Sequence, residues 1–199
     1  FYFTTCGWMM WNWLVSSLAV GSTIVLYEGS PFYPNSSSLW KLAEELNITV
    51  FGTSAKFIAA CQEAEVSPIK NHNLNRMRTI LSTGSPLVEE NYDYIYKNVK
   101  NDVMLSSISG GTDLISCFAL GNPMLPVYRG EIQCRGLGMA VESYDINGQF
   151  NLNQKGELVC KIAFPSMPIY FWNDENGDKY HQAYFSTYPD IWHHGDYIL

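Results

Sequence analysis

Basic side chains are scarce in this sequence. Only 12 of its 199 residues are Lys or Arg, none of them forms a run, and the formal net charge is −7. A nucleic-acid-binding surface, or a patch that binds anionic lipids, needs clustered basic residues. The composition therefore argues against both classes, and we expect no nucleic-acid partner.

Cysteine motifs are absent as well. The five cysteines are far apart in the sequence and include no C-x-x-C pair, which argues against a zinc site, a redox couple or a disulfide framework. We predict reduced, mostly buried thiols in a cytoplasmic protein. These residues are Cys6, Cys61, Cys117, Cys134 and Cys160.

Residues 1–27 contain no charged side chain. The stretch from Trp8 to Tyr27 is long enough to span a bilayer, so a membrane-anchored protein is one alternative. Against it, polar residues interrupt the stretch and no Lys or Arg flanks it. Gly21-Ser22 divides it into a helix and a β-branched strand over residues 23–27. We therefore predict no membrane span.

Helical and strand patterns alternate up to about residue 125, which predicts an α/β fold with a largely parallel sheet covered by helices. Ser54 is a suitable N-cap for the second of the expected helices. The expected helices cover residues 39–46, 55–64 and 86–99, and the expected strands cover residues 48–52, 77–81 and 103–106.

The pattern changes near residue 125. Beyond it the apolar segments are short, and turn signals such as Asn147-Gly148 recur between them. We expect strands at 131–135, 139–146 and 156–162, forming a smaller antiparallel, barrel-like subdomain. The predicted organisation is an α/β subdomain at 1–125 and an incomplete β-rich subdomain at 126–199.

Three polar motifs follow predicted strands or open one, at the places where parallel α/β sheets bind ligands. They are residues 82–86 (Ser-Thr-Gly-Ser-Pro), 106–113 (Ser-Ser-Ile-Ser-Gly-Gly-Thr-Asp) and 194–196 (His-Gly-Asp). Glycines let a backbone approach phosphate oxygens, while Thr and Asp add a hydroxyl and a metal-binding carboxylate. The combination suits a nucleotide, although each motif alone is as often a plain turn.

In order and spacing, these motifs resemble the adenylate-forming superfamily and, within it, the acetoacetyl-CoA synthetases. The superfamily's Gly-x-Thr-Glu turn, Gly-x-Pro loop and Gly-Asp pair correspond to residues 110–113, 84–86 and 195–196. Further stretches similar to this branch are residues 121–123, 130–134 and 137–142, and residues 184–187 resemble the acetyl-CoA synthetases as well.

The resemblance implies an AMP-forming acid–thiol ligase that uses ATP, Mg²⁺ and coenzyme A. By this resemblance Thr112 and Asp113 are the catalytic residues, with Thr112 at the α-phosphate and Asp113 on the Mg²⁺ ion. Asp196 would hold the ribose hydroxyls. The implied nucleotide-binding residues are Gly84, Ser85, Pro86, Ser109, Gly110, Gly111, Thr112 and Asp196.

Two positions depart from the wider family. Ser109 stands where many members place an aromatic residue against adenine, and Gly110 stands where acetyl-specific enzymes place a Trp. The missing indole predicts room for a longer acid, acetoacetate rather than acetate. Acetate, propionate, a longer keto acid, or a non-catalytic nucleotide-binding module remain alternatives. The implied acyl pocket comprises Trp8, Met9, Met10, Thr83 and Gly110.

Several parts of such an enzyme are not in this sequence. The family's Lys-bearing phosphate loop, the Arg that follows the ribose Asp, and the C-terminal domain with its adenylation Lys do not occur in it. Neither end resembles a natural terminus, so we expect an internal fragment of the large N-terminal domain. Its partners would be the flanking domains of the same enzyme, and alone it would be inactive.

Overall fold

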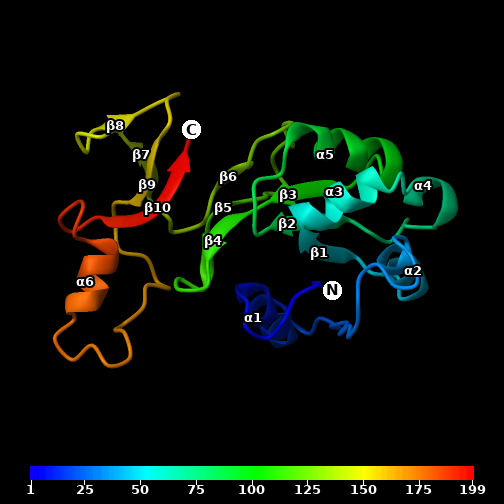
Figure 1. Cartoon of the computed structure of the whole chain (residues 1–199), viewed down its shortest axis with the longest axis horizontal. Helices are drawn as coiled ribbons and strands as arrows, with labels where there is room; N and C mark the ends of the chain where they lie inside the picture. Colours follow the sequence, from blue (N-terminus) through cyan, green and yellow to red (C-terminus); the bar gives the residue numbers. More distant parts are fainter. The chain divides into compact units, whose positions relative to one another are not determined.

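The computed structural model describes all 199 residues and divides them into two compact units. The first unit contains residues 1–109 and 119–134, and the second contains residues 110–118 and 135–199. Each unit is therefore built from two stretches of chain, which can be followed by colour in Figure 1. The expected subdomain boundary near residue 125 stays a prediction.

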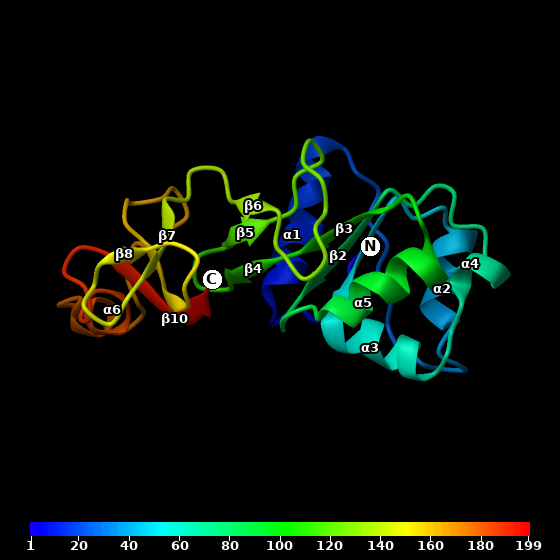
Figure 2. The same ribbon diagram turned by 90° about the horizontal axis from the view of Figure 1, so that it is seen from above.

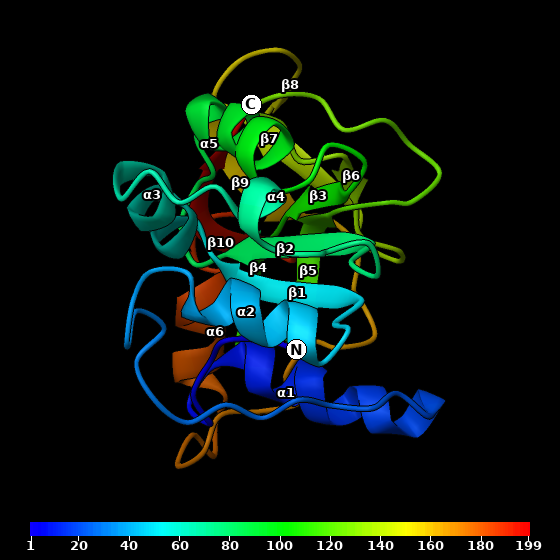
Figure 3. The ribbon, with the colours of Figure 1, turned by 90° about the vertical axis from the view of Figure 1, so that its right-hand side faces the viewer.

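The first unit contains the predicted parallel sheet. Its strands are β1 (Val50–Ser54), β2 (Thr79–Thr83) and β3 (Met104–Ser107), in the order β1-β2-β3 and all parallel. The strands are seen in turn in Figure 3. β1 and β2 begin two residues later than expected, and β2 therefore ends at Thr83, inside the polar motif 82–86.

Five helical segments accompany this sheet, and the helices near residues 39, 55 and 89 are confirmed. The Ser54 hydroxyl caps one of them by accepting the Phe57 N–H at 3.2 Å. Figure 2 shows α3 and α5, which contact each other, on one side of the strands. The segments are α2 (Ser38–Glu45), α3 (Ala55–Glu63), α4 (Pro68–Asn71), α5 (Glu89–Tyr94) and the π-helical turn η2 (Ile95–Val99).

Large apolar side chains from strands and helices form the core of the first unit. Trp40 of α2 stacks on Phe51 of β1, with ring centroids 4.8 Å apart, and both are fully buried. Ile80 of β2 and Leu105 of β3 continue this core across the sheet. Because such sites are densely packed, truncating one of the two aromatic residues costs about 3–5 kcal/mol of stability.

The apolar start of the chain folds differently from the prediction. It forms α1 (Met9–Ser16) and a 3₁₀ turn η1 (Ser17–Val20), but residues 23–27 are not a strand. Val25 and Tyr27 instead pack against the core from an irregular segment, while Tyr2 forms a single bridge with Gly52. No helix of the structure is long and apolar enough to cross a membrane.

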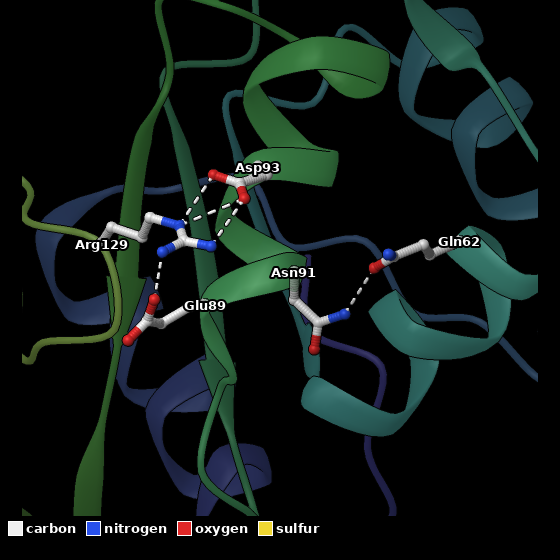
Figure 4. A network of polar contacts seen from close by, with 5 residues as sticks. All are labelled: Gln62, Glu89, Asn91, Asp93 and Arg129. Atoms are coloured by element: carbon white, nitrogen blue, oxygen red, sulfur yellow. Dashed lines mark hydrogen bonds and ion pairs between the residues drawn. The ribbon is translucent and has the colours of Figure 1, made fainter.

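In the first unit, hydrogen bonds from Arg129 connect the loop over residues 121–133 to α5. The Arg129 guanidinium donates to Asp93 at 2.9 and 3.0 Å and also to Glu89, as Figure 4 shows. The Gln133 side chain accepts the Asn122 N–H at 3.0 Å and donates to three carbonyls of the same loop. Two of the stretches that resemble the acetoacetyl-CoA synthetases, residues 121–123 and 130–134, are therefore joined by hydrogen bonds in this loop.

The second unit contains an antiparallel sheet in the order β10-β9-β7-β8. Its strands β7 and β9 agree with the strands expected at 139–146 and 156–162, whereas the strand expected at 131–135 is reduced to residues 134–135 and belongs to another sheet. The expected barrel is wrong, because the order leaves β8 and β10 as separate outer strands and the sheet is open. The elements are β7 (Val141–Tyr144), β8 (Phe150–Asn151), β9 (Gly156–Cys160), α6 (Asp178–Tyr184) and β10 (Trp192–Ile198).

Three short strands remain, in the order β4-β5-β6. They are β4 (Ser109–Gly111), β5 (Ser116–Leu120) and β6 (Cys134–Arg135). The tight turn that joins β4 to β5 contains the predicted catalytic residues, and Ile115 in this turn has a positive φ of 50°. The fold therefore presents these residues on a hairpin tip.

Candidate functional site

In the first unit, two of the predicted ligand loops lie side by side. Ser82 pairs with Ser107 at the carboxyl ends of β2 and β3. The Thr83 hydroxyl donates to the Ile108 carbonyl at 2.9 Å, and the Ile108 N–H donates to the Ser82 carbonyl at 2.9 Å. Parallel strands that end together form the usual ligand-binding edge of an α/β sheet.

The predicted adenine loop follows directly from β2. Gly84 and Pro86 are exposed and Ser85 is half-buried, so this loop is accessible to a ligand. The predicted pocket residues of α1 have mixed positions: Trp8 is 59% exposed, whereas Met9 is only 4% exposed and packs in the interior.

In the second unit, the Asp113 carboxylate is held by hydrogen bonds on both oxygens. Its Oδ1 accepts the Leu114 N–H at 3.2 Å, and its Oδ2 accepts the Tyr184 hydroxyl at 2.6 Å. A Cβ added to Gly111 would lie 2.2 Å from Oδ1. The carboxylate therefore occupies space that only a glycine at this position leaves free.

Asp196 lies on β10, where the pairing with β9 changes register between His193 and Tyr197. Such bulges often occur beside functional sites because they redirect side chains. The Asp196 side chain is 59% exposed, and His194 Nε2 lies 3.8 Å from its Oδ2. The carboxylate is thus accessible to hydroxyl donors.

His194 links this strand to the β4–β5 turn. Its ring packs against Phe118 at a centroid distance of 4.7 Å, and its Nδ1 faces the Trp192 Nε1–H at 3.4 Å. The position of a Cβ on Gly111 would be 3.2 Å from His194 Cε1. The predicted phosphate turn and the predicted ribose strand therefore converge within the second unit.

Gly110 has a different environment from the one expected for an open pocket. A Cβ on this residue would lie 2.3 Å from the Ser116 carbonyl oxygen and 2.9 Å from Cys117 Cα, both on the backbone of β5. A side chain at residue 110 would therefore push the two strands apart.

The residues fit a nucleotide with a divalent cation. Mg²⁺ commonly takes one or two protein carboxylates and fills its remaining positions with phosphate oxygens and water. Asp113 supplies one exposed carboxylate whose orientation is set by two donors. Asp196 supplies a second, accessible carboxylate of the type that accepts two hydroxyl groups.

The cysteines are free, and three of them are buried. Burial raises the pKa of Cys61 to about 11 and the pKa of Cys117 to about 12. A thiol must lose its proton to act as a nucleophile. Neither residue is therefore suited to covalent catalysis near neutral pH.

No protein-family model matches the chain. The acetoacetyl-CoA synthetase of Danio rerio is 57% identical over 196 residues, which are 98% of this chain and 29% of that enzyme. The enzyme of that name from Rhizobium meliloti (strain 1021) is 54% identical over 197 residues, 99% of this chain and 30% of that enzyme. The resemblance to the acetoacetyl-CoA synthetases is thereby confirmed.

Solved structures agree with this family. Acetoacetyl-CoA synthetase from Streptomyces lividans matches 99% of the chain and 31% of its own, with a TM-score of 0.92 and 45% identity. An anthranilate CoA ligase solved with anthranoyl-AMP matches 89% of the chain and 32% of its own, with a TM-score of 0.71 and 18% identity, and shares the fold. The chain thus spans under a third of the length of these relatives.

Sequence reasoning did not find Tyr184 or Trp192 as parts of the site. Tyr184 lies 71 residues after Asp113, so no local pattern could pair the two side chains. The one available signal was the position of Tyr184 at the start of residues 184–187, a stretch that resembles the acetyl-CoA synthetases.

Proposed function

We propose that this chain supplies part of the nucleotide-binding site of an ATP-dependent ligase that activates acetoacetate and transfers it to coenzyme A. The observation that supports this most directly is the convergence of Gly111, Asp113 and His194 beside Asp196 in the second unit. The relatives named acetoacetyl-CoA synthetase give the acid, and their greater length makes the complete activity a proposal.

The proposed roles follow from the chemistry of each side chain. Thr112 is exposed on the β4–β5 turn, where its hydroxyl can donate to the α-phosphate. Asp113 holds the cation, and Asp196 accepts the two ribose hydroxyls. When bound, Mg²⁺ offsets the negative charge that develops at the phosphate during the transfer.

The remaining proposed contacts come from the first unit. Gly84, Ser85 and Pro86 would line the adenine, and Ser109 offers it a hydroxyl where other members offer an aromatic ring. The candidates for the acyl pocket remain Trp8, Met9, Met10, Thr83 and Gly110. We also retain a cytoplasmic location, which the reduced, free cysteines favour.

Both steps of the proposed reaction are substitutions. A carboxylate oxygen of acetoacetate attacks the α-phosphorus, and the bond from that phosphorus to the oxygen bridging the β-phosphate breaks, which releases pyrophosphate. The thiol of coenzyme A loses its proton to water, and its sulfur attacks the acyl carbon. The bond from that carbon to the adenylate oxygen breaks, and AMP leaves with the bonding electrons.

The test uses the full-length protein that carries this segment. Pyrophosphate release and acyl-CoA formation are measured with ATP and acetoacetate, acetate or propionate as the acid. We expect the highest kcat/KM with acetoacetate. Equal or higher values with acetate would contradict the assigned acid, and no acyl-CoA with any of the three would contradict the ligase.

Asp196→Asn tests the nucleotide site directly. It removes the charge that accepts the ribose hydroxyls, and we expect roughly a 10- to 100-fold loss in kcat/KM for ATP. Asp190→Asn is the matched control, because Asp190 is an exposed Asp near the same strand whose φ of 61° Asn tolerates. Equal activity of the two variants would argue against a role for Asp196.

A further inference from the structure

The hydrogen bond between Tyr184 and Asp113 joins two distant parts of the second unit. The phenol donates to Asp113 Oδ2 at 2.6 Å across 71 residues of sequence. This distance is typical of a charge-assisted O–H to carboxylate bond, which is about twice as strong as a neutral one. A bond of this kind can fix the rotamer of an exposed carboxylate such as that of Asp113.

The donor is itself held rigidly. Tyr184 is the last residue of α6, and its ring stacks on Trp192 with centroids 3.6 Å apart and planes inclined by 13°. Trp192 is 1% exposed and belongs to the apolar core of this unit. The Tyr184 ring is therefore held in place by a buried side chain, and this fixes the position of its hydroxyl beside Asp113.

The acceptor needs such a partner. Asp113 lies in the exposed hairpin turn, and its only other hydrogen bond, from the Leu114 N–H, is a longer one at 3.2 Å. Gly111 keeps the space beside Oδ1 open. Without the phenol, the carboxylate could rotate about its side-chain bonds and lose the orientation in which both oxygens are now held.

We propose that Tyr184 is a positioning residue that orients the Asp113 carboxylate for the divalent cation accompanying ATP. The proposal rests on the proposed function, because it assigns to Asp113 a cation that arrives with the nucleotide. Groups that hydrogen-bond to metal-ligating carboxylates commonly contribute 10- to 100-fold to metal affinity or activity. Tyr184 touches neither the cation nor the nucleotide in this assignment.

Tyr184→Phe and Tyr180→Phe form a matched pair for the test. Both remove one hydroxyl and keep a ring on α6 that contacts Trp192. The Tyr180 hydroxyl is buried without a hydrogen-bond partner, so its loss removes no contact to a carboxylate. Any general effect of losing a phenol from this aromatic cluster should appear in the control.

The measurement is binding to the full-length protein, with Mn²⁺ as the probe. Mn²⁺ binding in the presence of ATP is followed by electron paramagnetic resonance, and AMP binding without metal is followed by calorimetry. We expect Tyr184→Phe to weaken Mn²⁺–ATP binding about 10-fold and to leave AMP binding unchanged. Tyr180→Phe should behave as the wild type in both measurements.

Two outcomes would overturn the assignment while leaving the proposed function intact. One is Mn²⁺–ATP binding that is equal in Tyr184→Phe and Tyr180→Phe, with the wild type active as a ligase. The other is an equal loss of AMP and Mn²⁺–ATP binding in Tyr184→Phe, which would indicate a merely structural role. A wild-type protein that binds no ATP and forms no acyl-CoA would overturn both proposals.

Discussion

The first unit is organised by three parallel strands that keep one register, whereas the second unit has short strands and a register change in β10. Regular strand pairing stabilises much of the first unit. Trp40 is one of many large side chains in its core. In the second unit, Trp192 contacts Tyr184, His194 and Phe164 at once. The comparison indicates that one aromatic side chain supports both the core and the candidate site there.

Replacing each of the two buried tryptophans should have the largest effect on stability, and it compares the two units directly. Trp192→Ala and Trp40→Ala should each lower the free energy of unfolding by about 3–5 kcal/mol. Only Trp192→Ala should also abolish AMP binding under conditions where the protein stays folded, because it removes the contact to His194, which lies beside Asp196. Chemical denaturation and calorimetry on the full-length protein measure the two effects. Equal AMP binding by both variants would contradict the comparison.

Alkaline pH should act on both units through their buried thiols. The folded-state pKa values are raised, to about 11 for Cys61 and about 12 for Cys117. Stability from these groups is complete below the unfolded-state pKa and is lost as pH rises toward the folded values. We expect a loss of about 2 kcal/mol per thiol by pH 10.

The measurement for this pH effect is the Tm at pH 7.5 and pH 10. Cys117→Ala removes one of the two thiols, so its Tm should fall less over this interval than that of the wild type. An identical fall in both proteins would show that Cys117 does not contribute.

Gly111→Ala should affect the site more than the fold. The added Cβ meets Asp113 Oδ1 at 2.2 Å and His194 Cε1 at 3.2 Å, so the carboxylate must move. We expect roughly a 10-fold loss in kcat/KM for ATP, comparable to the loss of a supporting contact to a ligand. Gly7→Ala is the control, since a Cβ there meets no atom within 4 Å. Unchanged kinetics in Gly111→Ala would show that Asp113 tolerates the shift.

The smallest expected effect concerns the loop of the first unit. Gln133→Ala removes one accepted and three donated hydrogen bonds within residues 121–133. Because the loop is partly accessible to water, we expect a net loss of about 1 kcal/mol and faster amide exchange at Asn122 and nearby residues. Hydrogen exchange followed by mass spectrometry measures this. A loss in kcat/KM for ATP as large as that of Gly111→Ala would show that Gln133 also matters for nucleotide use.

Local patterns predicted much of the first unit. The alternation of strands and helices indicated a parallel sheet, and Ser54 was correctly predicted as a helix cap because capping depends on residues only three positions apart. The strand expected at 23–27 was wrong. Its β-branched residues suit a strand, but the segment packs on the core without pairing to a neighbour.

The sequence by itself indicated the resemblance to the acetoacetyl-CoA synthetases, the polar motifs and the presence of strands that lead into Ser82 and Ser107, because each depends on neighbouring residues or on recognisable spacing. Tertiary structure alone decided that the antiparallel sheet stays open and that Tyr184 meets Asp113. Strand order and contacts across 71 residues arise from packing of the whole unit, and the burial of Trp192 brings these side chains together. No periodicity in the chain encodes that packing.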